Sequence, residues 1–165
     1  SKAAIAGLTD TNTAALAGVS IMNAYGLETK DIEGIYDTLF TTVQQGITTF
    51  DELAKNIGKV LPFAKMGGLS LNELGASLAT MTKMGINTRI ATRSLKNAIF
   101  ALKAPTGEAK IEMEKLGITG EESFTVMIEK IARANLGIKE MVKLGPSKRA
   151  VLAMVSIRNA FEQYQ

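Results

Sequence analysis

Five glycines punctuate the sequence, and each is followed by an aliphatic residue and then, within a few positions, by Ser, Thr or Asn. The five stretches are GLETKD at Gly26, GITTFDE at Gly46, GLSLNE at Gly68, GINT at Gly85 and GITGEE at Gly117. A glycine that ends a helix adopts the left-handed conformation at low cost, and the aliphatic residue then packs back on the last turn. The hydroxyl or amide that follows can cap the next helix. The pattern predicts short helices joined by tight turns.

Three of these restarts also have an acidic residue three positions after the expected cap, which is the arrangement of a capping box. The pairs are Thr49 with Glu52, Ser70 with Glu73, and Thr119 with Glu122. Apolar residues recur at three and four positions, as in Ile32, Ile35 and Leu39, and alternation with period two is nowhere sustained. We therefore predict an all-α fold, an irregular bundle or superhelix of about eight short helices. Their expected ranges are 11–25, 29–45, 49–65, 70–84, 88–104, 106–116, 121–135 and 147–163.

The composition limits what such a helical chain can do. Hydrophobic residues make up 46% and charged residues 21% of the 165 positions, which indicates a globular chain with a buried core. Cysteine and histidine are both absent. This excludes disulfides, thiolate nucleophiles and Ser-His or Cys-His catalysis, and it removes the commonest transition-metal ligand. We expect no enzyme, no cofactor and no metal site, although a carboxylate or lysine enzyme stays open.

Positive charge is concentrated in the middle of the chain. Residues 61–110 hold seven Lys or Arg against two Asp or Glu, whereas residues 1–60 hold four against seven and residues 111–165 hold eight against seven. In the fifth expected helix, Arg89, Arg93 and Lys96 are spaced to project from one face. Cations near a helix amino terminus oppose the helix dipole, so helix stability does not explain the two arginines. An anionic partner could explain them, so the three residues are candidate binding residues, but a solvated face is the interpretation that the charge pattern favours.

Local motifs give little support to DNA binding, nucleotide binding or acid/base chemistry. A helix-turn-helix DNA reader at residues 78–97 would need a small residue where Met81 lies, and the Walker and dinucleotide-binding glycine patterns are absent. The acidic pairs Asp51–Glu52 and Glu121–Glu122 could form an acid/base couple or a magnesium site, but both fall in the first turn of an expected helix, which favours capping. The eight methionines are expected in the core, with a Met-lined partner groove as the alternative.

The last expected helix, over residues 147–163, is apolar on more than one side between Ala150 and Ile157. Such a helix is either central to the core or packed against something outside this segment. Membrane contact is the alternative, with Lys148 and Arg149 at lipid headgroups and Phe161 and Tyr164 near the interface. No run of 18 apolar residues predicts a membrane-spanning helix.

The order of the segments DELA, GKVLP, LATMT, GINT and APTGEA, preceded by AGVSIMNAYGLE, resembles the core region of the phage tail tape measure family. The resemblance runs from about Ala14 to about Gly120 and is weaker beyond. It implies a virion structural protein of the tail lumen, made in the bacterial cytoplasm, which sets tail length during assembly and leaves the tube when DNA is ejected. The family supplies no catalytic residue to transfer.

The resemblance further implies partners among tail tube, tail-tip and assembly chaperone proteins. It leaves self-association and host-membrane contact at ejection open, and it implies no sequence-specific nucleic acid. Fully helical, the chain would span roughly 250 Å at 1.5 Å per residue, and its glycine turns should fold that into something far shorter. We therefore expect residues 1–165 to form a single helical module of a much longer chain. The second hypothesis is a membrane-active module that aids DNA passage through the host envelope. The third is a nucleic-acid-binding helical domain.

Overall fold

The computed structural model describes residues 8–163, and all regular structure in that range is helical. The all-α prediction is confirmed. Ten α-helices and two short 3-10 helices follow one another, two α-helices more than expected. They are α2 (Thr11–Tyr25), η1 (Thr29–Asp31), α3 (Ile32–Gln45), α4 (Phe50–Asn56), η2 (Ile57–Lys59), α5 (Leu61–Met66), α6 (Leu71–Lys83), α7 (Thr88–Lys103), α8 (Gly107–Lys115), α9 (Phe124–Arg133), α10 (Ile138–Leu144) and α11 (Lys148–Gln163).

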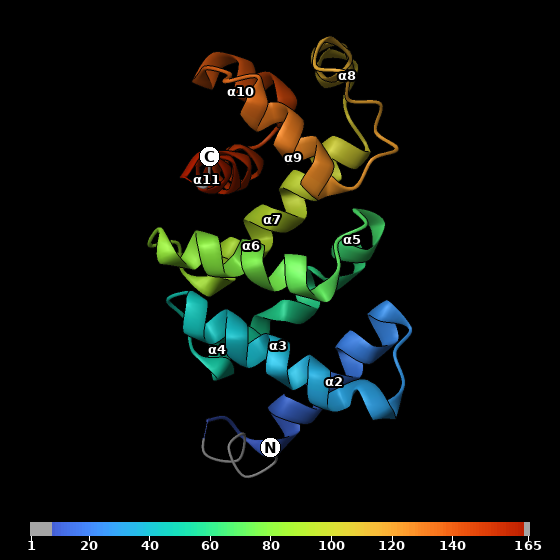
Figure 1. Ribbon diagram of the computed structural model, residues 1–165, viewed down its shortest axis with the longest axis vertical. Coiled ribbons are helices and arrows are strands. Elements are labelled where there is room, and N and C mark those ends of the chain that lie inside the picture. The colour runs from blue at the N-terminus through green and yellow to red at the C-terminus, as the bar shows by residue number, and fades with distance from the viewer. Residues whose placement is uncertain (1–7, 164–165) are drawn as a thin grey trace.

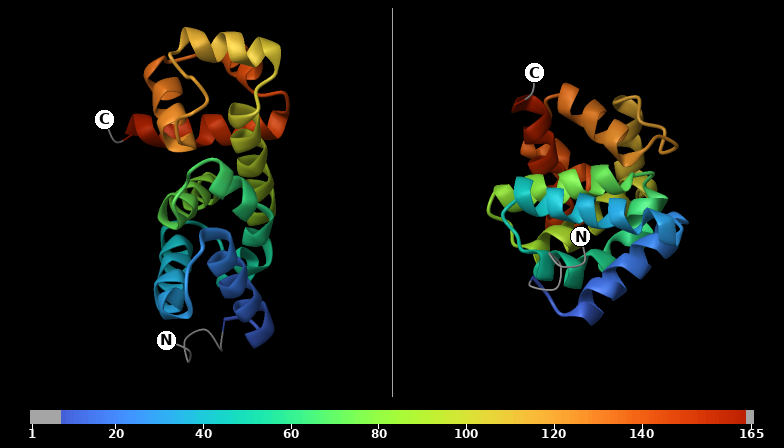
Figure 2. Two further views of the ribbon diagram at one scale, coloured as in Figure 1. Left: turned by 90° about the vertical axis from the view of Figure 1, so that its right-hand side faces the viewer. Right: turned by 60° about the horizontal axis from the view of Figure 1, so that its bottom comes forward.

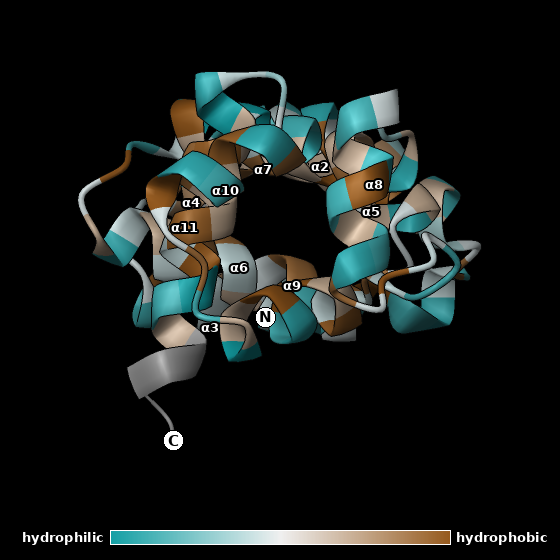
Figure 3. Ribbon diagram, turned by 90° about the horizontal axis from the view of Figure 1, so that it is seen from above, coloured by the Kyte–Doolittle hydropathy of each residue, from teal (hydrophilic) through white to brown (hydrophobic). Residues whose placement is uncertain are grey.

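The helices are stacked along one long axis. Helices α2, α3 and α4 form one end, α5 and α6 lie in the middle, and α8 to α11 form the other end (Figure 1). Viewed along the axis, the helices are arranged around it like an irregular superhelix (Figure 3). This is one of the two arrangements that the sequence predicts.

Helix α7 joins the two ends of this stack. It runs beside the middle and upper layers (Figure 2) and contacts α4, α5, α6, α9 and α11. The buried apolar side chains from α2 to α11 form one connected cluster, to which α7 contributes the fully buried Leu95, Ile99 and Leu102. Because burial of apolar surface dominates folding, this helix is the centre of the core.

Four of the five predicted glycine stops are confirmed. Gly26, Gly68, Gly85 and Gly117 have φ angles of 66°, 67°, 90° and 66°, in the left-handed region. The aliphatic residue after each glycine donates its N–H back to a carbonyl in the last turn of the helix, as in a Schellman motif. These bonds are Leu27 to Met22 (2.9 Å), Leu69 to Ala64 (3.0 Å), Ile86 to Met81 (3.2 Å) and Ile118 to Met113 (2.9 Å).

Gly46 is the exception, and the prediction of a left-handed stop there is wrong. Its backbone is extended, with φ −103° and ψ −170°. A Cβ at this position would lie 2.9 Å from the Ala79 Cα. Glycine is needed at position 46 because α6 passes too close to the chain for any side chain, not because of a positive φ.

The predicted capping boxes have three different outcomes. The Ser70 hydroxyl accepts from Glu73 N (3.1 Å) and the Glu73 carboxylate accepts from Ser70 N (2.8 Å), so this box is confirmed. Thr49 caps α4 by accepting from Glu52 N at 3.1 Å, but the Glu52 carboxylate bonds to the hydroxyls of Thr48 and Thr88 instead of closing the box.

The prediction that Thr119 and Glu122 form a capping box at the start of a helix is wrong. The Glu122 carboxylate does accept from Thr119 N (3.0 Å), but α9 begins only at Phe124, and its cap is Ser123, which accepts from Val126 N. The bond therefore shapes the loop before α9. Glu121 and Glu122 lie in this loop, so the prediction that they occupy the first turn of a helix is also wrong.

One expected helix is divided, and one helix of the structure was not expected. The segment 49–65 contains α4, η2 and α5 instead of one helix, because Pro62 cannot donate to a continuing ladder and lies in the first turn of α5. Helix α10 was not expected. The stop before it uses Asn135, with φ 46°, in place of a glycine.

Candidate binding face on helix α7

The cap and the apolar face of α7 fix which residues it presents to solvent. Asn87 caps the helix by accepting from Ile90 N at 2.9 Å. The inner face is fully buried as the sequence predicts, through the residues Ala91, Leu95, Ala98, Ile99 and Leu102. The opposite face then carries the predicted cations.

Hydrogen bonds between polar side chains hold the start of α7 against α4. The hydroxyls of Thr48 and Thr88 are 2.5 Å apart, and the Thr88 hydroxyl donates to the Glu52 carboxylate at 3.3 Å. Thr88 is buried, so these bonds satisfy a hydroxyl that would otherwise be costly to bury. These hydrogen bonds help to fix how the first turn of α7 is rotated about the helix axis, and therefore the direction in which Arg89 projects.

Arg89 and Arg93 are both exposed, one turn apart on the outer face of α7. Neither guanidinium has an ion pair or a hydrogen bond to any residue in the part of the chain that the structure describes. Two neighbouring guanidinium groups without an acidic partner can donate to an anionic surface. Their role in binding stays a prediction.

Lys96 is placed differently from the two arginines. Its side chain is half-buried, and its Nζ lies 5.2 Å from the centroid of the Phe63 ring. Phe63, from α5, packs edge-to-face on Phe100 with ring centroids 6.3 Å apart. The ammonium thus has a cation–π partner within the chain, which its compact charge can use without losing all of its water. We call Arg89, Arg93, Lys96, Phe63 and Phe100 the α7 face.

The aromatic part of the α7 face was missed by the sequence analysis. Phe100 lies four residues after Lys96, in the same series as the cations, and is 51% exposed. Its spacing was a usable signal. Phe63 comes from α5, which packs on α7 only in the folded chain. No local pattern around residue 63 indicates that contact.

The acidic residues serve the fold. Asp51 accepts from the Thr9 hydroxyl (2.6 Å) and from Lys55 Nζ (2.7 Å), and these hydrogen bonds, that of Lys55 first, hold the pKa of its carboxyl below the ordinary value. Asp51 and Glu52 lie in the first turn of α4, as predicted for a capping role. Among residues 8–163 there is no group of three acidic side chains that could hold a metal ion.

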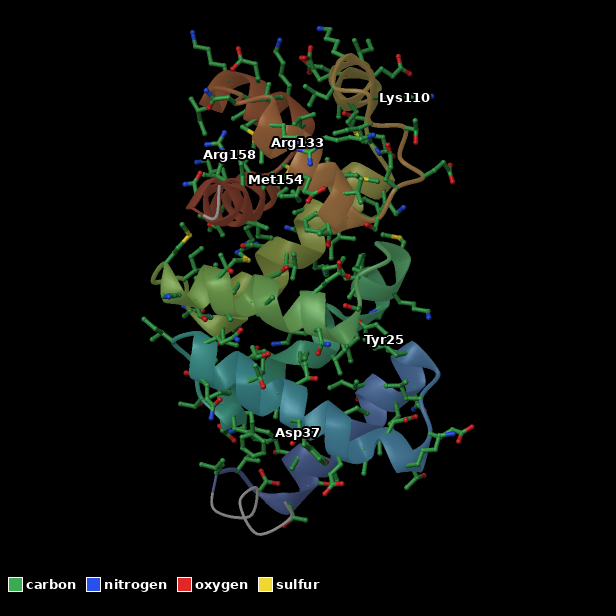
Figure 4. All side chains as sticks on the ribbon, in the orientation of Figure 1. Tyr25, Asp37, Lys110, Arg133, Met154 and Arg158 are labelled. Carbon is green, nitrogen blue, oxygen red and sulfur yellow. The ribbon has the colours of Figure 1, made fainter. Side chains whose placement is uncertain are left out.

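Tyr25 has a buried hydroxyl. It lies at the end of α2 beside α5 (Figure 4), and Lys65 Nζ is 5.9 Å from its ring centroid. Burial raises the pKa of Tyr25 to about 12, with a smaller contribution from Glu73, and its hydroxyl has no partner among the described residues. This tyrosine stays neutral under ordinary conditions.

The apolar stretch of α11 is used inside the fold. Ala150, Ala153 and Met154 are fully buried, and the helix contacts α7, α9 and α6. The expectation that it is central to the core is confirmed. Phe161 and Tyr164, named for membrane contact, have side chains outside the described part of the structure. No helix within residues 8–163 is long and apolar enough to cross a membrane.

Comparison with known proteins gives a consistent result. Among curated relatives, a probable tape measure protein of Clostridium phage phiCD119 is 27% identical over 159 residues, and one of Escherichia phage P2 is 26% identical over 125 residues. A tape measure protein of Pneumococcus phage Dp-1 is 28% identical over 100 residues. These matches cover 95%, 72% and 61% of this chain but only 17%, 15% and 9% of the relatives. No solved structure matches the chain significantly.

The sequence profile of one family, described as phage-related minor tail protein, matches residues 1–163. The match includes the segment after Gly120, where the motif resemblance was weaker. The chain therefore belongs to the family of phage-related minor tail proteins, and its resemblance to tape measure proteins is confirmed.

Proposed function

We propose that this chain is a non-enzymatic module of a phage or prophage tail tape measure protein that acts in tail assembly, in tail-length determination and in genome ejection. A structural role in the phage tail follows from the family. The chain spans less than a fifth of the length of the three relatives described above. We infer that it is a folded module of a longer protein, located in the tail lumen of the virion and in the bacterial cytoplasm during assembly.

The strongest support for this proposal is the composition of the α7 face. Arg89 and Arg93 are exposed without an acidic partner among the described residues, and the half-exposed Phe100 lies on the same helix. Arginine and aromatic residues are enriched at the centres of protein interfaces. We propose that the α7 face contacts an acidic surface of a tail tube, tail-tip or assembly chaperone protein.

The chemistry of the chain supports a contact role over a catalytic one. Without Cys or His, the candidates for proton transfer are carboxylates, lysines and tyrosines, and the buried Tyr25 has a raised pKa that keeps it neutral. Asp51 and Glu122 are each held by a lysine and a threonine hydroxyl, and Lys103 donates to backbone carbonyls. These groups stabilise turns and helix starts.

Charge reversal in the intact phage tests the contact. The double change R89E/R93E is introduced into the parent reading frame, and assembled tails are counted and measured by electron microscopy. We expect a strong loss of full-length tails, because reversed charge opposes an acidic partner. The matched control is K139E/R149E, which changes the net charge equally at two exposed cations of α10 and α11. Normal tails with R89E/R93E would make the α7 face a solvated surface.

Nucleic acid is the competing occupant of the same face. If contact with phosphate were the function, purified protein would bind duplex DNA near physiological salt and R89E/R93E would abolish binding. We expect no sequence-specific shift of duplex DNA, and any weak association should be lost steeply as the salt concentration rises. Tight binding of DNA that resists salt would contradict the proposal that the α7 face contacts a tail protein.

A further inference from the structure

Helix α2 carries no charged side chain. Its sequence, TNTAALAGVSIMNAY over Thr11–Tyr25, contains no Asp, Glu, Lys or Arg. The helix nevertheless lies at one end of the stack, where one of its sides is open (Figure 2). A surface helix normally places charged residues on its outer side. An uncharged outer side is suited to packing against another protein surface.

The two sides of α2 are both suited to packing. The inner side is buried through Ala14, Ala17, Gly18 and Ile21, and Gly18 lets Tyr36 of α3 approach closely. On the outer side, Leu16 is 59% and Val19 46% exposed. The other exposed outer residues are small or amide side chains, namely Asn12, Ala15, Ser20 and Asn23.

The outer residues follow the spacing of a helix–helix seam. From Asn12 through Leu16 and Val19 to Asn23 the steps are four, three and four residues, which keeps these side chains on one side of the helix. Ala15 and Ser20 flank the seam and allow a neighbouring backbone to come close. The seam is 12 residues long, so it spans about 17 Å at 1.5 Å per residue.

The seam is also symmetric about its midpoint, which falls between Ala17 and Gly18. When a second copy of the helix runs antiparallel across that midpoint, each outer residue faces one of matching character. Leu16 faces the partner's Val19, Ala15 faces the partner's Ser20, and Asn12 faces the partner's Asn23. This is the self-complementarity that a two-fold symmetric contact needs.

We propose that the outer side of α2 is a contact between two copies of this chain, with the two α2 helices antiparallel. The pairing buries Leu16 and Val19 at its centre. It gives amide partners to Asn12 and Asn23, whose side chains make no hydrogen bond to any of the residues that the structure describes. The absence of charge on α2 removes the like-charge repulsion that most surface helices would meet when paired with themselves.

One short helix from each copy buries less surface than a standard stable interface, which covers about 800 Å² on each partner. The contact should therefore form at high local concentration and dissociate on dilution. It uses neither Arg89 nor Arg93, so it does not depend on the proposed function of the α7 face. A failure of one proposal leaves the other in place.

Cysteine cross-linking tests the antiparallel register directly, since the natural chain has no cysteine. Three samples of the chain are oxidised: N12C alone, N23C alone and an equal mixture. Antiparallel pairing brings residue 12 beside the partner's residue 23, whereas two copies of residue 12 lie about 17 Å apart along the axis. We expect the mixture to give a cross-linked heterodimer in several-fold excess over either single variant. A matched pair on α3, T41C mixed with Q45C, measures random collision.

Two results would overturn the proposal. One is efficient cross-linking of each single variant with itself, which would mean a parallel pairing. The other is a yield from the N12C and N23C mixture no higher than that of the α3 control pair. Because both asparagines are exposed, the variants should fold normally, and circular dichroism checks this.

A second variant tests the contact without oxidation. L16E places a carboxylate at the centre of the seam, and sedimentation should then show a monomer at concentrations at which the unaltered chain self-associates. V142E, at an exposed valine of α10, is the control and should leave the association unchanged. Unaltered association of L16E would contradict the proposed contact even if cross-links form.

Discussion

The Lys130 Nζ lies 2.6 Å from the Glu122 carboxylate and ties α9 to the loop that precedes it. The same carboxylate accepts from Thr119 N (3.0 Å), the Thr119 hydroxyl (2.8 Å) and Gly120 N (3.0 Å). Lys103, near the end of α7, donates to the carbonyls of Gly120 (3.0 Å) and Glu122 (2.9 Å). A loop without regular structure is therefore fixed by two lysines from two helices.

The first prediction concerns the pH dependence of this loop. Hydrogen bonds to Glu122, that of Lys130 first, hold the pKa of its carboxyl well below the ordinary value. In the unfolded chain the pKa is about 4.3, so the stabilisation is fully present above that pH and is lost as pH falls toward the folded pKa. E122Q should lower the free energy of unfolding by about 1 kcal/mol at pH 7 and by less at pH 3.

Urea denaturation at both pH values measures this difference. E121Q is the matched control, because the neighbouring Glu121 side chain makes no ion pair among the described residues. If E122Q cost the same stability at pH 3 as at pH 7, the stabilisation would not come from the ionised carboxylate.

The second prediction concerns the close contact of α3 and α6. A Cβ on Gly75 would clash with the Thr42 hydroxyl oxygen, while the Thr42 Cβ would remain at an ordinary 3.7 Å. G75A should therefore lower the free energy of unfolding by about 1–3 kcal/mol. In a T42A background the clash is removed, and G75A should then cost much less. Denaturant unfolding of the four proteins in the cycle gives the coupling energy.

Gly34 provides the matched control for Gly75. It lies in the first turn of α3, and an added Cβ would have no atom within 4 Å. G34A should raise stability by about 0.5–1 kcal/mol, because alanine loses less backbone freedom on folding. Equal losses from G34A and G75A would refute the close α3–α6 approach.

The third prediction contrasts two tyrosines. The Tyr36 hydroxyl donates to the Ala14 carbonyl at 2.9 Å, whereas the Tyr25 hydroxyl is buried without a partner among the described residues. Y36F should cost about 1 kcal/mol of unfolding free energy, while Y25F should be neutral or slightly stabilising.

Ionisation of Tyr25 gives an independent check of its burial. Because burial raises the folded pKa of Tyr25 from 10 to about 12, ionisation of Tyr25 leaves the free energy of unfolding unchanged below pH 10 and lowers it as pH rises from 10 toward 12. Ultraviolet titration should show a tyrosine that titrates near pH 12 and that Y25F removes, in addition to Tyr36, whose pKa is also raised by burial. A full complement of tyrosines titrating near pH 10 in the folded chain would contradict the burial of Tyr25.

The fourth prediction concerns Asn135, whose φ of 46° is the single positive value at a non-glycine residue within residues 8–163. A residue with a Cβ pays about 1–2 kcal/mol for the left-handed conformation, and asparagine tolerates it better than alanine. N135A should lower the free energy of unfolding by about 1 kcal/mol, and N135G should be at least as stable as the natural chain. A neutral N135A, measured by urea denaturation, would contradict the left-handed stop.

The same residue shows what sequence reasoning could and could not find. Four glycine stops were found because glycine is the usual residue at a left-handed helix end. The stop at Asn135 and the seven-residue α10 were missed because asparagine also caps helices and occurs in loops. Gly46 was misassigned because its role is to admit α6, and the approach of Ala79 is visible only in the folded chain.

Only the part of the α7 face that lies on one helix could be predicted from the sequence. The spacing of Arg89, Arg93 and Lys96 depends only on helix geometry, so their shared side of α7 could be predicted. The cation–π contact of Lys96 could not be, because Phe63 arrives from α5 through tertiary packing. Sequence reasoning also could not show that the two arginines lack an acidic neighbour, since such a neighbour could have come from any helix.

The central claim is that this module works in the phage tail through the α7 face, and photo-cross-linking in assembled tails tests it most directly. A photoreactive amino acid is placed at Arg93, and at Lys139 as the control, in the phage that carries this chain; the cross-linked products of purified tails are identified by mass spectrometry. The account predicts a specific cross-link from position 93, and not from position 139, to another tail protein. Absence of the chain from purified tails, or equal cross-linking from both positions, would contradict it.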